Sequence, residues 1–455
     1  MTLDPDTLAP EEIIERLLER AGRRGLPEFE VFLLRKDSLA IAAKEGRLDQ
    51  VRRQDELGAA LRMLDRGRLG FAYTTIFTTE ALDRTAARAA AAAALTDPQP
   101  GLELPDPPDG PWLPGEGPDP EVERTPLEEK IERVLEMERS ALEFDPRIER
   151  VRLAEYRQTA YSVWLANSRG LGYKHSGTIF SADVLAKAAA GDEAEMGYES
   201  DFSLRYAGLD LSALGRAAAR RAVMSLGGRR VPSGKTPVIL ENRVAAAFLG
   251  LLTPSFLAEN VQKGKSTLAG KLGQTIMSPV INITDDGLYP GGLASSPADG
   301  EGAPRRKTPL VEGGRLTGLL YDLTRANREG QVSTGNANRG DYRMPPSLGP
   351  SNVILAPGMK SPQDLSQDLS EGLLVTEVMG LHTADAISGD FSLGAAGFKI
   401  SRGRPEYPVK GLALAGNLFV MFNRVAGVGS DFRLTGATGA PALLIEELIV
   451  GGRRP

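Results

Sequence analysis

The chain has 455 residues, of which 41% are hydrophobic and 25% are charged, a composition typical of a soluble globular protein with two or three domains. Its formal net charge of −6 argues against a general nucleic-acid-binding surface. It contains no cysteine, which excludes disulfides, thiol catalysis and metal sites held by thiolates.

The N-terminal region predicts a cytoplasmic protein. Its first residues, Met1–Asp6, are acidic and lack the apolar stretch of a secretory signal. The longest apolar run, Val244–Leu252, is far shorter than the roughly 20 residues that a membrane span needs. The absence of cysteine also fits a reducing compartment. We therefore expect no membrane contact.

Residues 1–96 predict a first unit of helices and strands. A helix over residues 10–21 begins with a proline and two acidic residues, and its apolar residues recur at helical spacing. An alanine-rich helix over residues 80–95 closes the unit. Between the two helices, strand patterns separated by turn signals cover residues 28–34, 38–44, 57–64 and 70–75.

Residues 97–125 predict a proline-rich linker. Prolines recur from Pro98 to Pro126, and each removes a backbone donor that a helix or a sheet would need. Two interpretations remain open: a solvated spacer, or an extended arm that Trp112 and Leu113 pin to a neighbouring surface.

Residues 126–227 predict a second unit with the same order of elements. Thr125 and Glu128 form a capping-box pattern around Pro126, which starts a helix that runs to about residue 143. An alanine-rich helix over residues 211–226 ends at a pair of glycines. The order helix, strands, alanine-rich helix thus appears twice, which favours a structural duplication. The intervening strand patterns cover residues 148–154, 161–166, 171–180 and 202–206.

Residues 228–455 predict a mostly β domain. Glycines and short apolar runs dominate this part of the chain, and helical patterns are confined to residues 243–253 and 361–371. The whole chain is therefore predicted to be an α+β protein, with two N-terminal units of helices and antiparallel sheet followed by a β-rich C-terminal domain.

Several motifs suggest chemistry that their surroundings do not support. Gly264-Lys265-Ser266-Thr267 resembles the end of a phosphate-binding loop, but Glu259 stands where that loop needs glycine, so a basic turn is the better interpretation. The acidic groups around Asp285 and Asp299 could hold a divalent cation, but they lie among turn-forming residues without calcium-loop spacing, which favours turns. The basic run at residues 305–307 is typical of a solvated surface.

The segment Gly380–Ile400 has the clearest site-like character. It carries His382, one of only two histidines, with Thr383, Ser388 and Asp390 among small residues. A Ser-His-Asp triad is disfavoured because no serine has the Gly-x-Ser-x-Gly surroundings of a nucleophile elbow. We therefore expect a structural or substrate-lining histidine. The polar residues expected to bind substrate or to line its cavity are His382, Thr383, Ser388, Asp390, Asn336 and Asn417.

The C-terminal motifs resemble the TldD/PmbA family, also known as modulators of DNA gyrase. The resemblance covers nearly the whole chain, and its most specific part is Gly380–Gly397. The other matching segments are Val261–Ser266, Asp299–Gly302, Ser333–Asn336, Gly416-Asn417 and Val428–Asp431.

The family has two branches, and the resemblance implies which one applies. In the TldD branch, a helix with a His-Glu-x-x-x-His motif and a C-terminal cysteine binds zinc and forms a metallopeptidase; the PmbA (TldE) branch lacks these ligands. Counting back without gaps from Gly264, the corresponding positions here are Leu249, Gly250 and Pro254. Zinc hydrolysis needs at least three ligands and usually a carboxylate base, and the predicted helix at residues 243–253 offers none.

The resemblance therefore implies a non-catalytic PmbA/TldE-type subunit. Its expected partner is a TldD-type metallopeptidase chain, which would carry the zinc; this chain needs no cofactor and contacts no nucleic acid directly. The substrate would be an unfolded peptide or a peptide precursor, gripped by strand addition. In isolation the chain could also form a homodimer. Two alternatives remain open: a self-contained hydrolase centred on His382, and a non-enzymatic binder of gyrase or a related complex.

Overall fold

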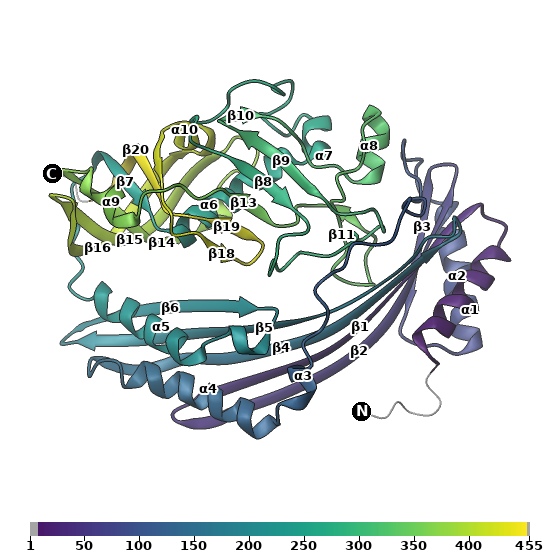
Figure 1. The fold of residues 1–455 in the computed structure, drawn as a ribbon, viewed down its shortest axis with the longest axis horizontal. Helices are drawn as coiled ribbons and strands as arrows, with labels where there is room; N and C mark the ends of the chain where they lie inside the picture. The colour runs from purple at the N-terminus through teal and green to yellow at the C-terminus, as the bar shows by residue number, and fades with distance from the viewer. Residues whose placement is uncertain (1–7, 453–455) are drawn as a thin grey trace.

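One long antiparallel sheet spans the first half of the chain (Figure 1). The computed structural model describes residues 8–452, so the predicted absence of a signal in Met1–Asp6 lies outside it. The predicted α+β class is confirmed, with a strand-rich C-terminal domain over one face of this sheet and helices over the other (Figure 1). In spatial order, the strands of the sheet are β3 (Arg68–Thr74), β2 (Arg47–Asp65), β1 (Glu28–Lys44), β4 (Ile148–Asn167), β5 (Gly172–Ala190) and β6 (Glu193–Ser203).

The helices form two pairs on the same face of this sheet. The first pair is α1 (Pro10–Gly22) with α2 (Thr79–Ala93), and the second is α4 (Leu127–Leu142) with α5 (Leu211–Ser225). Each pair has its own apolar core, because the odd-numbered residues of β1 face α1 and α2 near its start and α4 near its end. The predicted repetition of helix, strands and helix is therefore present, with three strands in each copy in place of the four predicted, and the β1–β4 ladder joins both copies into one sheet.

The alanine-rich helices approach the sheet very closely, and by the same device in both units. A Cβ added to Gly70 in β3 would lie 1.9 Å from the Ala89 carbonyl oxygen of α2. A Cβ added to Gly197 in β6 would lie 2.2 Å from the Ala218 carbonyl oxygen of α5. Glycine on the strand and alanine on the helix are thus required for this packing distance.

Replacement of Gly197 by alanine should therefore destabilise the protein. The new methyl group must displace the α5 backbone, and such overpacking costs about 1–3 kcal/mol. Gly172→Ala, in β5 of the same sheet, is the matched control because a Cβ there meets no atom within 4 Å. Urea unfolding of both variants measures the difference, and equal stabilities would contradict the close helix–strand packing.

The strands are longer than their apolar patterns predicted. Residues 28–34 and 38–44 belong to one strand, β1, and β2 begins at Arg47, ahead of the predicted start at residue 57. The extra residues, such as Arg53 and Asp37, are held by the β1–β2 ladder and by a 2.7 Å ion pair across it. The backbone of β1 and β2 stays paired beyond the residues whose side chains are buried. The alternation of apolar and polar residues reports only the buried part, so the strands predicted from it are too short.

The proline-rich segment is a wrapping arm. Trp112 donates its Nε1 hydrogen to the Gly172 carbonyl at 3.1 Å and packs its ring edge against Tyr173. Asn167 donates to the Pro105 carbonyl at 2.8 Å, and Leu104 is buried. The arm interpretation is therefore correct for Trp112 but wrong for Leu113, which is exposed. The arm leads through the short helix α3 (Glu121–Arg124) to α4.

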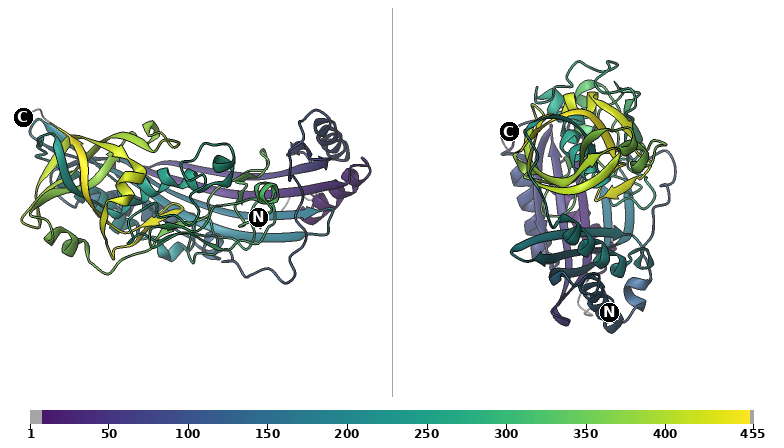
Figure 2. Two further views of the ribbon diagram at one scale, coloured as in Figure 1. Left: turned by 90° about the horizontal axis from the view of Figure 1, so that it is seen from above. Right: turned by 90° about the vertical axis from the view of Figure 1, so that its left-hand side faces the viewer.

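The C-terminal domain contains a closed barrel, visible end-on in Figure 2. The barrel closes because β16 (Arg404–Asn417) pairs with β20 (Leu443–Gly451). Its other strands are β15 (Asp390–Ser401), β14 (Glu371–Met379) and β7 (Gly234–Leu240), with β17 (Val425–Val428) added beside β20. Among residues 8–452, no helix is long and apolar enough to cross a membrane.

A second, smaller sheet and the buried helix α6 (Asn242–Leu252) complete this domain. Phe248 of α6 packs edge-on against Phe391 of the barrel, with ring centroids 5.1 Å apart. The strands of the second sheet, in order, are β10 (Arg315–Leu316), β9 (Lys307–Glu312), β8 (Ile283–Asp286), β13 (Val353–Leu355), β19 (Thr438–Ala440) and β18 (Arg433–Thr435). The remaining elements are α7 (Ala258–Gln262), α8 (Leu323–Glu329), β11 (Ala337–Asn338), β12 (Ser347–Leu348), α9 (Pro362–Gln367) and α10 (Leu418–Asn423), with short 3₁₀ turns at Tyr206–Gly208, Thr253–Phe256 and Leu381–Thr383.

Candidate functional site

The predicted site segment connects β14 to β15 at one end of the barrel. Gly380 adopts a left-handed conformation with φ 81° and starts the turn that carries His382. Asp385 then folds the segment back, because its carboxylate accepts hydrogen bonds from the backbone of Ile387 at 2.7 Å and of Ser388 at 3.1 Å. These bonds lower the pKa of Asp385, so it stays ionised as the anchor of the turn.

Ser388, Asp390 and Asn417 meet in one hydrogen-bonded cluster. The Ser388 hydroxyl donates to one Asp390 carboxylate oxygen at 3.0 Å, and the Asn417 amide donates to the other at 2.9 Å. Asn417 also donates to the Ser388 carbonyl and accepts from the backbone of Phe419, which begins α10. The cluster exists because the β15–β16 ladder places Asp390 opposite Asn417. Its polar groups bond mainly to one another, which makes it a rigid rim to the barrel end.

His382 and Thr383 lie in the same turn but outside this cluster. The Thr383 hydroxyl donates to the Gly380 carbonyl at 2.8 Å. His382 is exposed, and within residues 8–452 no hydrogen bond joins it to Ser388 or Asp390. The Ser388 hydroxyl is directed to Asp390 instead, so the geometry does not form a Ser-His-Asp relay.

Asn336 belongs to a different, interior network. It is fully buried and donates to the Asp285 carboxylate at 2.9 Å and to the Gly349 carbonyl at 3.2 Å. Ser351 donates to the same carboxylate through its backbone at 2.7 Å and through its hydroxyl. The turn interpretation was wrong for Asp285, which lies in strand β8, and correct for Asp286, whose carboxylate accepts the backbone hydrogen of Leu288 at 3.0 Å. The structure brings Asn336 to none of the other predicted site residues.

The three positions that the resemblance assigns to the zinc motif carry no side chain that can bind a metal ion. Leu249 is fully buried in the core, Gly250 offers no side chain, and Pro254 offers no donor. Across residues 8–452, no three histidine, cysteine, aspartate or glutamate side chains are placed to hold a metal together. The side chains present are thus those of a packed helix and cannot supply zinc ligands.

A buried ion cluster joins the N-terminal sheet to the C-terminal domain, and sequence reasoning missed it. This inter-domain cluster consists of Glu30, Arg62, Glu301 and Arg339. Arg62 of β2 pairs with Glu30 of β1 at 2.6 Å and with Glu301 at 3.2 Å. Arg339 pairs with the other Glu30 oxygen at 2.8 Å. Charges buried this deeply are tolerated only when paired, so the cluster fixes how the two parts dock.

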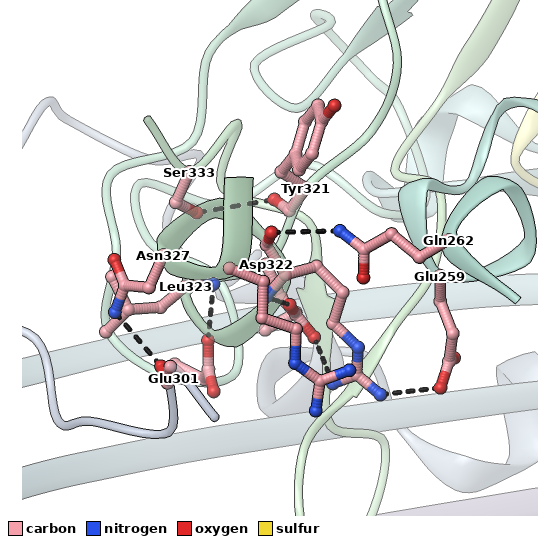
Figure 3. Close-up of polar contacts among 12 residues, drawn as sticks. Glu259, Gln262, Glu301, Tyr321, Asp322, Leu323, Asn327 and Ser333 are labelled. Carbon is pink, nitrogen blue, oxygen red and sulfur yellow. Dashed lines mark hydrogen bonds and ion pairs between the residues drawn. The ribbon is translucent and has the colours of Figure 1, made fainter. Parts of the chain in front are cut away.

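Glu301 also reaches the start of α8, as Figure 3 shows. One of its carboxylate oxygens accepts the backbone hydrogen of Leu323 at 3.2 Å, next to Asp322. Arg325 of the same helix bridges Asp322 at 2.8 Å and Glu259 of α7 at 2.6 Å. The predicted turn at residues 299–301 is confirmed, since the Asp299 carboxylate accepts from the backbone of Glu301 at 2.9 Å.

The basic run at residues 305–307 does not form a solvated surface throughout. Arg305 is buried and donates to the Ser296 hydroxyl at 3.1 Å and to the Asn338 side chain at 3.0 Å. The prediction was wrong for this residue because a loop distant in sequence covers it. A run of basic residues can be buried when other parts of the chain supply hydrogen-bond acceptors for their side chains.

A second buried cluster lies at the other end of the interface, around Glu199 of β6. Its carboxylate pairs with Arg221 of α5 at 2.7 Å, with Arg243 of α6 at 3.1 Å and with Arg433 of β18 at 2.7 Å. Arg221 also pairs with Glu241 at 2.7 Å. The two clusters therefore clamp the C-terminal domain to the sheet at separate points.

Between these clamps, the sheet face turned toward the C-terminal domain carries side chains of mixed size and charge, among them Arg157 and Lys36. Ser38 and Thr159 are paired across β1 and β4, with their hydroxyls 3.2 Å apart, and Ile179 lies opposite Thr159 on β5. These side chains are half-buried. The same face packs against the C-terminal domain through Phe32 and Tyr342. The C-terminal domain therefore covers this face only in part.

Comparison with known proteins gives consistent matches along the chain. Models of PmbA/TldA metallopeptidase domain 1, central domain and C-terminal domain match residues 29–93, 120–226 and 233–452. An uncharacterized protein of Methanocaldococcus jannaschii is 34% identical over 287 residues, covering 63% of this chain and 66% of that protein. The metalloprotease PmbA of Escherichia coli O157:H7 is 27% identical over 452 residues, covering 97% of this chain and 96% of that protein.

Solved structures share the fold. A candidate modulator of a DNA gyrase from Thermotoga maritima MSB8 has a TM-score of 0.90 and 27% identity, covering 97% of this chain and 100% of that one. TldE from Thermococcus kodakarensis has a TM-score of 0.86 and 22% identity, covering 97% and 100%. At 22% identity, the similarity to the Thermococcus kodakarensis structure shows only that the fold is shared.

Proposed function

The chain belongs to the PmbA/TldD metallopeptidase family, and from that premise we propose that it is a non-catalytic PmbA/TldE-type subunit of a two-chain peptidase. In this role a TldD-type partner holds the zinc and performs hydrolysis. This chain completes the enclosure of the site and binds an extended, unfolded peptide or peptide precursor.

One observation carries this proposal: the helix that would hold the zinc motif has apolar residues in its place. Leu249 fills the core, and the chain contains no cysteine to serve as a further ligand. Its two histidines lie in β5 and in the turn after β14, in separate domains. Zinc hydrolysis requires several converging ligands, which these residues do not supply.

The half-buried sheet face between the two ion clusters supports a role in holding peptide. At Ser38 and Thr159 its side chains are small, so an extended chain can lie close to the sheet at that point. Contacts at such a point need not select one peptide sequence, which suits a peptidase that acts on unfolded substrates.

Neither alternative function is favoured by a specific observation. A hydrolase centred on His382 needs a nucleophile aligned with the imidazole, whereas the Ser388 hydroxyl donates to Asp390. A gyrase-binding role is suggested by the description of the Thermotoga maritima protein, which concerns that protein. The net charge of −6 offers no support for direct DNA contact.

Metal analysis and peptidase assays test the proposal directly. The purified chain should contain no stoichiometric zinc and should cleave no unfolded peptide, and cleavage should appear when a TldD-type chain is added. His382→Ala should leave the cleavage by the mixture unchanged. Tight zinc binding by the isolated chain would contradict the proposal. Peptide hydrolysis by the isolated chain that is lost in His382→Ala would contradict it as well.

A further inference from the structure

Arg305 is a buried cation whose side chain contacts only neutral groups. It is 8% exposed, and it donates to the Ser296 hydroxyl at 3.1 Å and to the Asn338 side-chain oxygen at 3.0 Å. Within residues 8–452, its Nη1 nitrogen is buried and has no hydrogen-bond partner. Buried arginines are nearly always paired with an anion, because an unpaired buried charge is strongly unfavourable. This guanidinium is therefore suited to an anionic group from another molecule.

The carboxylates that feel the charge of Arg305 are bound by other groups. Burial raises the pKa of both Asp285 and Asp299, and the charge of Arg305 opposes this rise. The Asp285 carboxylate accepts the backbone hydrogen of Ser351 at 2.7 Å, and the Asp299 carboxylate accepts that of Ala337 at 3.0 Å. In the part of the chain that the structure describes, Arg305 donates to neither carboxylate. Its Nη1 hydrogens thus stay available to a further acceptor.

Two tyrosines of the N-terminal sheet lie near Arg305, and a histidine adjoins one of them. Burial raises the pKa of Tyr161 and of Tyr173, and the charge of Arg305 opposes the rise for both, so both hydroxyls lie within its field. The Tyr173 hydroxyl is buried, and its hydrogen has no acceptor among residues 8–452. The Tyr161 hydroxyl lies 3.4 Å from His175 Nε2. A phenol and a guanidinium together are donors suited to a carboxylate.

The wrapping arm covers this region from the outside. Residues 113–118 are all exposed, and they pass over His175 so closely that a Cβ at Gly115 would lie 2.9 Å from His175 Cε1. The Glu116 carboxylate attaches them by accepting the Gly291 backbone hydrogen at 2.7 Å. An exposed segment with few buried contacts opens at low cost in free energy. The arm can therefore lift without unfolding either domain.

We propose that Arg305 and Tyr173 bind a carboxylate of the peptide, which enters when residues 113–118 lift. The carboxylate is that of the C-terminus or of an acidic side chain, because both present the same two oxygens to the guanidinium. Tyr161 lies two residues after Thr159 in β4 and on the same face, so the site adjoins the surface proposed to hold peptide. This inference rests on that proposed role.

Peptide binding to the purified chain tests the site. The probe is an unfolded peptide with an N-terminal dye and no acidic residue, made with a free C-terminus, with an amidated C-terminus, and amidated with one internal aspartate. By fluorescence anisotropy, the free acid should bind about tenfold more tightly than the plain amide, as expected of a charge-assisted hydrogen bond. Tight binding of the aspartate peptide would show that a side-chain carboxylate fits as well. If neither carboxylate-bearing peptide binds more tightly than the plain amide, the proposal is wrong.

Two adjacent arginines provide matched variants. Arg305→Gln should abolish the preference for a carboxylate, whereas Arg306→Gln, at the exposed neighbour, should retain it. Tyr173→Phe should weaken binding of the free acid about threefold and leave the urea midpoint unchanged, because the hydroxyl that it removes has no partner among residues 8–452. A preference that survives in Arg305→Gln, or in Tyr173→Phe at full strength, would overturn the proposal.

Cleavage assays separate this inference from the proposed function. If the mixture with a TldD-type chain cleaves the free acid and the amide equally, and Arg305→Gln changes neither rate, the peptidase role stands and the carboxylate site falls. If the mixture cleaves nothing while the isolated chain still binds the free acid through Arg305, the carboxylate site stands and the peptidase role falls.

Discussion

Replacing Arg62 by methionine should lower the free energy of unfolding by about 3–5 kcal/mol, the usual cost of removing one partner of a buried ion pair. Arg62 is 2% exposed, and its guanidinium serves both Glu30 and Glu301. Methionine fills a similar volume but leaves two carboxylates buried beside a single remaining cation, Arg339. The loss should be measured by urea unfolding, followed by the fluorescence of Trp112 and Trp164.

A surface ion pair provides the matched control. Arg147→Met breaks the 2.8 Å pair between Arg147 and Asp145 at the surface, and it should change the stability far less than Arg62→Met does, because solvent screens this pair. Adding Glu30→Gln and Glu301→Gln to Arg62→Met should recover part of the lost stability, because no unpaired carboxylate then remains. An Arg62→Met chain as stable as Arg147→Met would show that the buried pairs do not hold the two parts together.

The long helices of this fold could be predicted from sequence because their signals are local, whereas the short helices α3, α7, α8 and α10 were missed. Pro10 with its acidic neighbours begins α1, and Pro126 immediately precedes α4. The pairing of the strands could not be predicted. The alternation of apolar and polar residues shows which face of the sheet a side chain lies on, but it does not show which strand lies next to which. The pairing of β1 with β4 joins residues more than a hundred positions apart, and the pairing of β16 with β20 closes a barrel that no single segment specifies.

The candidate site shows the same limit. The turn around His382 could be predicted as polar and exposed, but Asn417 enters its cluster only because the β15–β16 ladder places it opposite Asp390. Strand β16 ends at Asn417 for a related reason, since the Asn417 side chain caps α10. A signal for the inter-domain cluster was present and unused: Arg62 interrupts an otherwise apolar strand run. A charge in such a run indicates a buried partner elsewhere.

Glu301→Gln should remove a pH dependence of stability that the wild type carries between about pH 4.5 and 7. Burial, together with the nearby charges of Asp299 and Asp322, raises the pKa of Glu301 from its ordinary 4.5 to about 7. Arg62 opposes this rise only in part, because it lies nearer to Glu30, at 2.6 Å, than to Glu301, at 3.2 Å. The folded state therefore holds the Glu301 proton more tightly than the unfolded chain does. The resulting stabilisation is fully present below about pH 4.5 and is lost as the pH rises through 7.

The variant should accordingly gain about 3 kcal/mol relative to wild type between pH 4 and pH 8, as measured by urea unfolding across that range. Glu149→Gln is the control of opposite sign, because hydrogen bonding to Lys187 lowers the pKa of Glu149, so the contribution of Glu149 is lost as the pH falls. If the stability difference between Glu301→Gln and wild type stayed constant with pH, Glu301 would be ionised throughout. Arg62 and the α8 backbone would then outweigh burial, and the cluster would be a fully charged clamp between the sheet and the C-terminal domain.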